Sequence, residues 1–300
     1  MVKNSKRRSW KRTLMVALGV LFLVIIGAVW LVIWHVAPRA MVNPVRTNAG
    51  ALPPAGVRAS TLQVGDGIQL AVWQAAPKGK PRAAIILLHG IADSKKCFAG
   101  SLRSWADQGI LAIAPDLRGH GDSGGTASYG DWEKYDMSRL REEVTREHPG
   151  IPVGLWGTSY GGAVALQSAA VDPLFSFVIV ESTFSSLRKI ACDQVSMHTH
   201  GSLAWLAPIA LRRAGELGNF DFSRVEPARA AGMISMPVLH LHGEKDELIS
   251  IEHAHLIRAA SRGARYQFLS FAQGGHYNLR ASDTATYDRV TQKFLKSVTR

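Results

Sequence analysis

The chain has 300 residues, 47% of them hydrophobic, and a formal net charge of +12. This length and composition are typical of a folded protein with a sizeable core, and they exclude broad disorder. Six of the 35 Lys and Arg residues lie among residues 1–13, which contain no acidic residue, and the other 29 are spread among 23 acidic residues. The charge after residue 13 is therefore too diffuse to favour a nucleic-acid-binding protein.

The first predicted element is a membrane-spanning helix, which follows a basic cytoplasmic segment at 1–13. Leu14–Trp34 supplies 21 residues without a charge. At about 1.5 Å per residue, such a helix reaches roughly 31 Å, which matches a hydrocarbon core of about 30 Å. A cleaved signal peptide is the alternative, but its apolar region normally runs about 7–15 residues. We predict an uncleaved transmembrane helix over 14–36.

The positive charges predict the orientation of this helix. Six basic residues precede it, whereas only Arg39, Arg46 and Arg58 follow it before residue 60. Because positive flanks tend to stay in the cytoplasm, we expect the rest of the chain on the extracytoplasmic, or periplasmic, side of the cell (inner) membrane. No second comparable apolar span occurs, which predicts a single-pass protein.

Residues 37–60 are rich in Pro, Gly, Ala and Arg and are predicted to be a linker, with one domain following over 61–300. In that domain short apolar runs alternate with segments of helical length. The alternation predicts an α/β fold, a mostly parallel sheet with helices on both faces. The predicted strands are Ile68–Trp73, Ala83–Leu88, Leu111–Pro115, Pro152–Trp156, Phe177–Val180, Pro237–His242 and Arg265–Leu269, and the predicted helices are Phe98–Gln108, Trp132–His148, Tyr160–Val171, Glu252–Ala260 and Ser282–Ser297.

One crossover in this series is unusually long. The 56 residues between Phe177–Val180 and Pro237–His242 exceed what a bare loop in a compact domain accommodates. We predict a small lid insertion at about 182–230. It contains the apolar stretch Ser202–Arg213, which is expected to cover a pocket or to touch a bilayer.

A serine among glycines follows the predicted strand that ends at Trp156. The residues are Gly157-Thr158-Ser159-Tyr160-Gly161, a Gly-x-Ser-x-Gly pattern between a strand and a helix. This is the context of a nucleophile elbow, in which the glycines allow a tight turn and the serine takes a strained conformation. An ordinary surface loop is the alternative. The position favours Ser159 as a nucleophile.

A serine nucleophile needs a base and an acid that orients the base. Asp246 follows the Pro237–His242 strand, and His276 follows the last predicted strand. The order Ser159, Asp246, His276 is the one used by hydrolases with this type of sheet. Glu244 and Glu181 are rivals for the acid, and a surface or helix-capping role is the alternative for His276.

Attack on a carbonyl creates an oxyanion, which backbone N–H groups must stabilise. Tyr160, directly after the serine, is expected to supply one of them. Ile91 is the second candidate, because it follows His89-Gly90 at the end of the Ala83–Leu88 strand. An ordinary turn at His89-Gly90 is the alternative.

Taken together, five segments resemble the α/β-hydrolase superfamily over residues 61–300: LLHGIADS, APDLRGHGDSGG, GLWGTSYGG, LHGEKDELIS and GGHYN. The sequence looks most similar to the membrane-anchored, Bem46-like or serine-aminopeptidase-like (S33-type) branch. The resemblance implies a nucleophile, a base and an orienting acid at Ser159, His276 and Asp246, with oxyanion donors at Ile91 and Tyr160. It also implies a structural loop, without a chemical role, at Asp116–Gly124. Ile91 departs from the family pattern, where glycine or asparagine is frequent.

No cofactor or metal is predicted. The histidines at 198 and 200, and at 253 and 255, are two residues apart, which on a helix places them on different faces. No dinucleotide fingerprint lies in the right place. Cys97 and Cys192 are predicted to be two separate thiols, with a disulfide as the alternative.

These features predict a membrane-tethered serine hydrolase that cleaves a small-molecule acyl ester or a lipid-derived substrate through an acyl-enzyme. The membrane, reached through the N-terminal helix, is the expected partner, and nucleic acid is not. Two alternatives stay open. One is an aminopeptidase-like amide or thioester hydrolase with the same triad, and the other is a catalytically silent domain that serves as a binding module.

Overall fold

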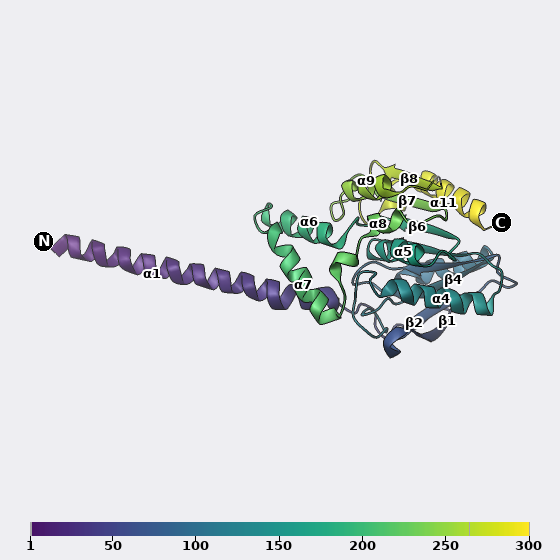
Figure 1. The fold of residues 1–300 in the computed structure, drawn as a ribbon, viewed down its shortest axis with the longest axis horizontal. Coiled ribbons are helices and arrows are strands. Elements are labelled where there is room, and N and C mark those ends of the chain that lie inside the picture. Colours follow the sequence, from purple (N-terminus) through teal and green to yellow (C-terminus); the bar gives the residue numbers. More distant parts are fainter. Residues whose placement is uncertain (1, 264, 300) are drawn as a thin grey trace.

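The computed structural model describes residues 2–263 and 265–299. Met1 of the predicted cytoplasmic segment and Ala264 and Arg300 of the predicted domain lie outside the described residues. The chain begins with a long helix that projects away from the rest of the protein (Figure 1). Helix α1 (Val2–Leu31) continues through a π-helical turn η1 (Val32–Val36) into α2 (Ala37–Val42). The part over Trp10–Val42 is long and apolar enough to cross a membrane, and none of its most apolar window is buried.

Residues 37–60, predicted to be a linker, contain regular secondary structure at both ends. Its first residues form α2, and strand β1 (Arg58–Gln63) begins before residue 61. The chain between them is bound to the domain, because Arg46 donates to the carbonyls of Gly121 and Ser123 and the Gly50 N–H donates to Asp122. These contacts are tertiary, so composition alone did not reveal them.

The domain is built on one eight-stranded sheet, as the α/β prediction requires. The strand order is β1-β2-β4-β3-β5-β6-β7-β8. Strands β1 and β2 pair antiparallel with each other, and β2 pairs antiparallel with β4, whereas the pairs from β4 to β8 are parallel. The remaining bounds are β2 (Gln69–Ala75), β3 (Ala83–Leu88), β4 (Ile110–Pro115), β5 (Val153–Thr158), β6 (Phe177–Glu181), β7 (Val238–Gly243) and β8 (Tyr266–Phe271).

Every predicted strand is present, and the one that was not predicted lies at the edge. Strands β3, β4, β6 and β7 are buried at every position, which explains the apolar runs of β3, β4 and β6, whereas β7 also buries His240 and His242. Strand β1 is largely exposed and reads RASTLQ, so it lacks an apolar run. Pairing with β2, rather than burial of its own side chains, holds it in the sheet.

Helices cover both faces of the sheet. One core cluster joins the sheet to α4, α5, α8 and α9, and another joins it to α3 and α11. The prediction of a mostly parallel sheet covered on both sides is therefore confirmed. The bounds are α3 (Ala99–Asp107), α4 (Glu133–Glu147), α5 (Tyr160–Val171), α8 (Pro227–Ala231), α9 (Ile251–Ala260), α10 (Leu279–Ser282) and α11 (Thr284–Val298), with short 3-10 turns η2 (Gly65–Gly67) and η3 (Lys95–Phe98).

The long crossover between β6 and β7 folds into helices outside the sheet. Before α8 it contains α6 (Leu187–Thr199), η4 (Ala204–Leu206), α7 (Ala207–Gly218) and η5 (Phe222–Arg224). We call α6, η4 and α7 the insertion. It lies between the body of the domain and α1, with α7 beside α2 (Figure 1).

Candidate active site

Ser159 lies in a strained turn between β5 and α5. Its backbone has φ 55° and ψ −118°, in the positive-φ region that non-glycine residues rarely adopt. The flanking glycines allow this close approach, because a Cβ on Gly157 would overlap the Gly161 carbonyl. Strand β6 and the loop after it hold the turn: the Ser159 N–H donates to the Glu181 carbonyl at 2.8 Å, and Thr183 Oγ1 donates to the Ser159 carbonyl at 2.8 Å.

Asp246 and His276 are brought together by the loops that follow β7 and β8. His276 Nδ1 lies 2.8 Å from Asp246 Oδ2, and Oδ1 of the same carboxylate accepts from the Leu248 and Ile249 N–H groups at 3.0 and 2.8 Å. Burial by itself would raise the pKa of Asp246, but the bonds from His276 and Ile249 outweigh it, so the pKa lies below its usual range. Because an ionised carboxylate only accepts, Nδ1 carries the proton and Nε2 is left as an acceptor.

The two rival acids are occupied elsewhere. Glu181 is buried, and its Oε1 accepts from Trp156 Nε1 at 2.7 Å and from the Tyr287 hydroxyl at 2.5 Å. Glu244 is exposed and accepts from Ser270 Oγ. Asp246 is thus the one of these three carboxylates that contacts His276.

Ser159 and His276 share one edge of the sheet. Strands β5 to β8 pair in parallel, so their carboxyl ends, from which Ser159, Asp246 and His276 emerge, meet at the same edge. Among the described residues no hydrogen bond joins Ser159 Oγ to His276 Nε2. Such bonds are often long without substrate and tighten in the reacting complex.

The two predicted oxyanion donors, Ile91 and Tyr160, belong to segments next to Ser159. The loop after β3 comes close to it, since a Cβ added to Gly90 would lie 3.8 Å from Ser159 Cβ. Within the described parts of the chain, neither the Ile91 nor the Tyr160 N–H donates a hydrogen bond. Tyr160 is the first residue of α5, where an N–H has no partner within the helix. Both donors remain candidates for an oxyanion hole.

His89 is a functional candidate that sequence reasoning left as part of a turn. Its Nε2 accepts from the Leu117 N–H at 3.0 Å, so Nδ1 carries the proton and donates to the Gly90 carbonyl at 2.8 Å. Burial, with a smaller effect of nearby His120, lowers the pKa of His89 to about 3, which keeps the ring neutral. His89 therefore fixes the loop that carries Ile91, and its place directly before Gly90 was the available signal.

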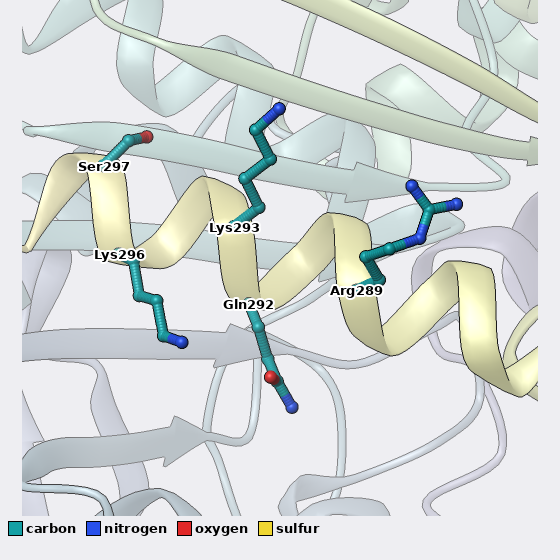
Figure 2. Close-up of a pocket in the computed structure, with 5 residues that line it drawn as sticks. All are labelled: Arg289, Gln292, Lys293, Lys296 and Ser297. Carbon is teal, nitrogen blue, oxygen red and sulfur yellow. The ribbon is translucent and has the colours of Figure 1, made fainter.

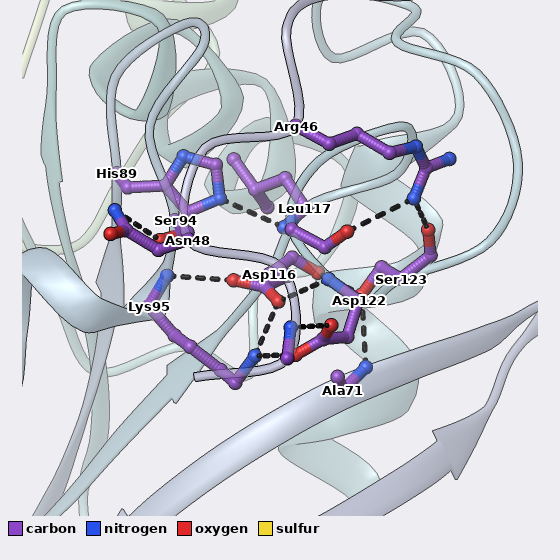
Figure 3. A network of polar contacts seen from close by, with 12 residues as sticks. Arg46, Asn48, Ala71, His89, Ser94, Lys95, Asp116, Leu117, Asp122 and Ser123 are labelled. Carbon is purple, nitrogen blue, oxygen red and sulfur yellow. Dashed lines mark hydrogen bonds and ion pairs between the residues drawn. The ribbon is translucent and has the colours of Figure 1, made fainter. Parts of the chain in front are cut away.

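A network of hydrogen bonds and ion pairs also holds the loop after β3 (Figure 3). Asp116 is fully buried and accepts from the Lys95 backbone N–H at 2.7 Å and from Lys95 Nζ at 2.5 Å. The Asp122 N–H donates at 2.8 Å to Asp116 Oδ2, which is the oxygen that Lys95 Nζ contacts. Asp116 thus ties its own loop to the start of η3, which agrees with the structural role that the resemblance implies.

A second serine, histidine and aspartate meet at the base of the insertion. We call Ser185, His253 and Asp193 the Ser185 cluster. His253 Nδ1 accepts from the Ser185 N–H at 3.0 Å and lies 2.8 Å from Ser185 Oγ, while its Nε2 lies 2.9 Å from Asp193 Oδ2. Ser185 and His253 are buried, and the cluster joins α6 to α9. The sequence interpretation placed His253 only in a helix and missed this contact.

Two hollows are lined by residues other than Ser159. One, of about 650 Å³, is a basic surface depression along α11, and the close-up shows that its lysine and arginine side chains extend from the helix (Figure 2). The other, of about 530 Å³, lies between α3 and α11 and reaches Trp156, Thr158 and Glu181. Neither is lined by a predicted site residue. The residues lining the first are Arg289, Gln292, Lys293, Lys296 and Ser297.

Known proteins share this fold and parts of this sequence. Residues 79–217 match the family described as serine aminopeptidase, S33. An uncharacterized Bacillus subtilis protein, YqkD, is 25% identical over 77% of this chain and 77% of its own length. A monoacylglycerol lipase of Mycolicibacterium smegmatis is 26% identical over 62% of this chain and 77% of its own length. A solved esterase structure from Pyrococcus furiosus superposes with a TM-score of 0.71 at 19% identity, over 87% of this chain and 99% of that one.

The fold and these relatives together define the class of protein as a hydrolase. The chain has the α/β-hydrolase fold, and its residues 79–217 match the serine aminopeptidase-like branch of that superfamily. The resemblance noted in the sequence is thereby confirmed.

Proposed function

We propose that this protein is a membrane-tethered serine hydrolase that cleaves carboxylic esters through an acyl-enzyme. The observation that carries the proposal is the 2.8 Å contact between His276 Nδ1 and Asp246 Oδ2, which leaves Nε2 as a base at the sheet edge where the strained turn of Ser159 lies. The similarity to lipases and esterases supports an ester as the substrate class.

The proposed reaction uses each group in turn. Ser159 Oγ attacks the ester carbonyl carbon while His276 Nε2 takes the hydroxyl proton, and Asp246 stabilises the resulting imidazolium. The N–H groups of Ile91 and Tyr160 receive the oxyanion. When the intermediate collapses, the alcohol leaves with the proton from Nε2. Water then attacks the acyl-enzyme with the same base, which releases the acid and restores Ser159.

The test is substitution of the nucleophile in the full-length protein. Ser159→Ala is expected to abolish both labelling by a fluorophosphonate probe and turnover of p-nitrophenyl esters, because no other group supplies the attacking oxygen. Ser104→Ala, at an exposed serine of α3, is the matched control and keeps both. Unchanged labelling of Ser159→Ala would refute the nucleophile, and a wild type inert to probe and esters would favour a binding module instead.

An amide or thioester substrate is the second candidate, because the matching family is described as a serine aminopeptidase. The same triad can cleave an ester, a thioester or an amide, which differ in the leaving group. A graded series of p-nitrophenyl esters, acyl thioesters and aminoacyl amides, compared by kcat/KM on one preparation, decides between them. Highest kcat/KM for aminoacyl amides would replace the ester proposal.

The tether and its orientation are also part of the proposal. The apolar helix over Trp10–Val42 supports a membrane span, and the basic residues before it support a cytoplasmic N-terminus. Protease added outside intact spheroplasts should therefore digest the domain, while protease added to inverted vesicles should not. The reverse pattern would place the active site in the cytoplasm, and recovery in the soluble fraction would remove the tether.

A further inference from the structure

The insertion is packed against the continuation of the N-terminal helix. Val42 of α2 is 1% exposed and belongs to one buried cluster with Leu211 and Ala214 of α7. The helices approach closely at Gly218, where an added Cβ would lie 2.9 Å from Val42 Cγ1. Because α1, η1 and α2 form one continuous helical segment, α7 is fixed relative to the apolar helix.

A cation–π contact places α7 at the end of the apolar stretch. The Arg213 guanidinium lies 5.5 Å from the centre of the Trp34 ring, and Trp34 stacks on Trp30 with ring centres 5.3 Å apart. Trp and Arg side chains favour the boundary between hydrocarbon and water. If α1 spans the membrane, α7 therefore lies at that boundary, on the side of the catalytic domain.

The tip of the insertion is apolar and exposed. Trp205 is 68% exposed and Met197 is 46% exposed, on the two sides of the connection between α6 and α7. That connection lies on the side of the domain from which α1 extends (Figure 1). Residues 194–215 contain no Asp or Glu, which avoids repulsion from lipid phosphates.

We propose that this tip is a second membrane contact, with Trp205 and Met197 lying in the interface of the bilayer that α1 spans. The inference rests on the proposed tether and deepens it. Gln194 Nε2 donates to the Leu248 carbonyl at 2.6 Å, so the insertion also touches the loop that carries Asp246.

Site-specific labels in the full-length protein test this contact. A Cys97→Ser and Cys192→Ser background receives Trp205→Cys, Met197→Cys or Leu174→Cys, each labelled with an NBD fluorophore and reconstituted into nanodiscs. Leu174 is the matched control, because it is also 68% exposed but precedes β6, at the sheet edge opposite Ser159. Lipids carrying a doxyl quencher near the headgroup then report proximity.

The expected result is strong quenching and a blue shift at positions 205 and 197 and none at 174. Equal signals at 205 and 174, whether quenched or not, overturn the contact. Retention in the nanodisc is scored first on the unlabelled protein, so loss of the tether is seen separately from loss of the tip contact. Labelling of Ser159 by a fluorophosphonate probe in each variant shows that the fold is intact, and Met197 provides a second position if the Trp205 variant does not fold.

Discussion

Two groups of serine, histidine and aspartate lie in this domain, and they differ in the backbone conformation of the serine and in the contacts of the histidine. Ser159 has a positive φ of 55°, whereas the φ of Ser185 is not positive. His276 uses Nδ1 to contact its aspartate, whereas His253 uses Nδ1 to accept the Ser185 N–H and Nε2 to contact Asp193. The residue types alone do not separate a candidate triad from a structural cluster.

Backbone shape and access separate the two groups. Ser159 has a positive φ, and the His276 side chain, which is 7% exposed, lies against the ring of Tyr277, which is 87% exposed. His253 is 0% exposed, so no substrate reaches it. The Ser185 cluster instead binds the first helix of the insertion to α9. The predictions below test this division of roles, from the largest expected effect to the smallest.

The largest difference is expected between the two histidines. His276→Ala removes the base and should lower kcat for ester hydrolysis by about 10⁴–10⁶-fold. His253→Ala should leave kcat within a few-fold at low temperature, because this residue does not touch the substrate. Steady-state kinetics with p-nitrophenyl butyrate measure both. The division would be wrong if the two variants lost activity equally.

Replacing each aspartate should give a smaller but still large contrast. Asp246→Asn places an amide against His276 Nδ1, favours the wrong tautomer, and should reduce kcat by about 10⁴-fold. Asp193→Asn has no route to the reacting atoms and should keep nearly full activity. The KM of Asp246→Asn should change little, since the residue orients the base. Full activity of Asp246→Asn would remove Asp246 from the proposed triad and reopen the choice of acid.

The loss of stability should be larger for His253→Ala than for His276→Ala, which is the reverse of the order expected for activity. His253→Ala leaves the buried Ser185 N–H without an acceptor, which costs about 1–3 kcal/mol of unfolding free energy. His276→Ala leaves Asp246 with its bonds from the Leu248 and Ile249 N–H groups, so it should cost less. Thermal unfolding in detergent, followed by circular dichroism, measures the two. His198→Ala, at an exposed residue of α6, serves as the control. A smaller loss for His253→Ala than for His276→Ala would contradict a structural role for the cluster.

The smallest predicted effect is a pH dependence of the Ser185 cluster. Burial lowers the pKa of His253, although Asp193 partly opposes this and Lys189 adds to it. As pH falls through about 6.5, the unfolded chain takes up a proton at this residue and the folded chain does not, so stability decreases. The wild type should therefore lose more Tm than His253→Gln between about pH 7.5 and about pH 5.5. Parallel Tm curves would show that His253 does not contribute.

The sequence predicted the elements whose own residues determine them. Strand β3 is apolar throughout, β7 is apolar except for His240 and His242, and α5 begins directly after a recognisable turn at Ser159. Strand β1 and helix α2 were not predicted, because pairing with β2 and packing on α7 stabilise them. Such partners are distant in the chain and leave no local pattern.

The candidate site divides in the same way. Spacing and order indicated Ser159, Asp246 and His276, since each follows a strand of the parallel sheet. Tautomers and contacts between distant side chains depend on three-dimensional packing, so the hydrogen bonds of His89 and the Ser185 cluster were not predicted. Ser185 comes from the loop before α6, Asp193 from α6 and His253 from α9, and these segments meet only after folding.

Mapping the covalent adduct of a fluorophosphonate probe tests the central claim most directly. The full-length wild type, labelled at neutral pH and digested, is analysed by tandem mass spectrometry. The account predicts one adduct, on the peptide containing Ser159, and none on the peptide containing Ser185. An adduct on Ser185, or no adduct anywhere in a folded and membrane-bound preparation, would contradict it.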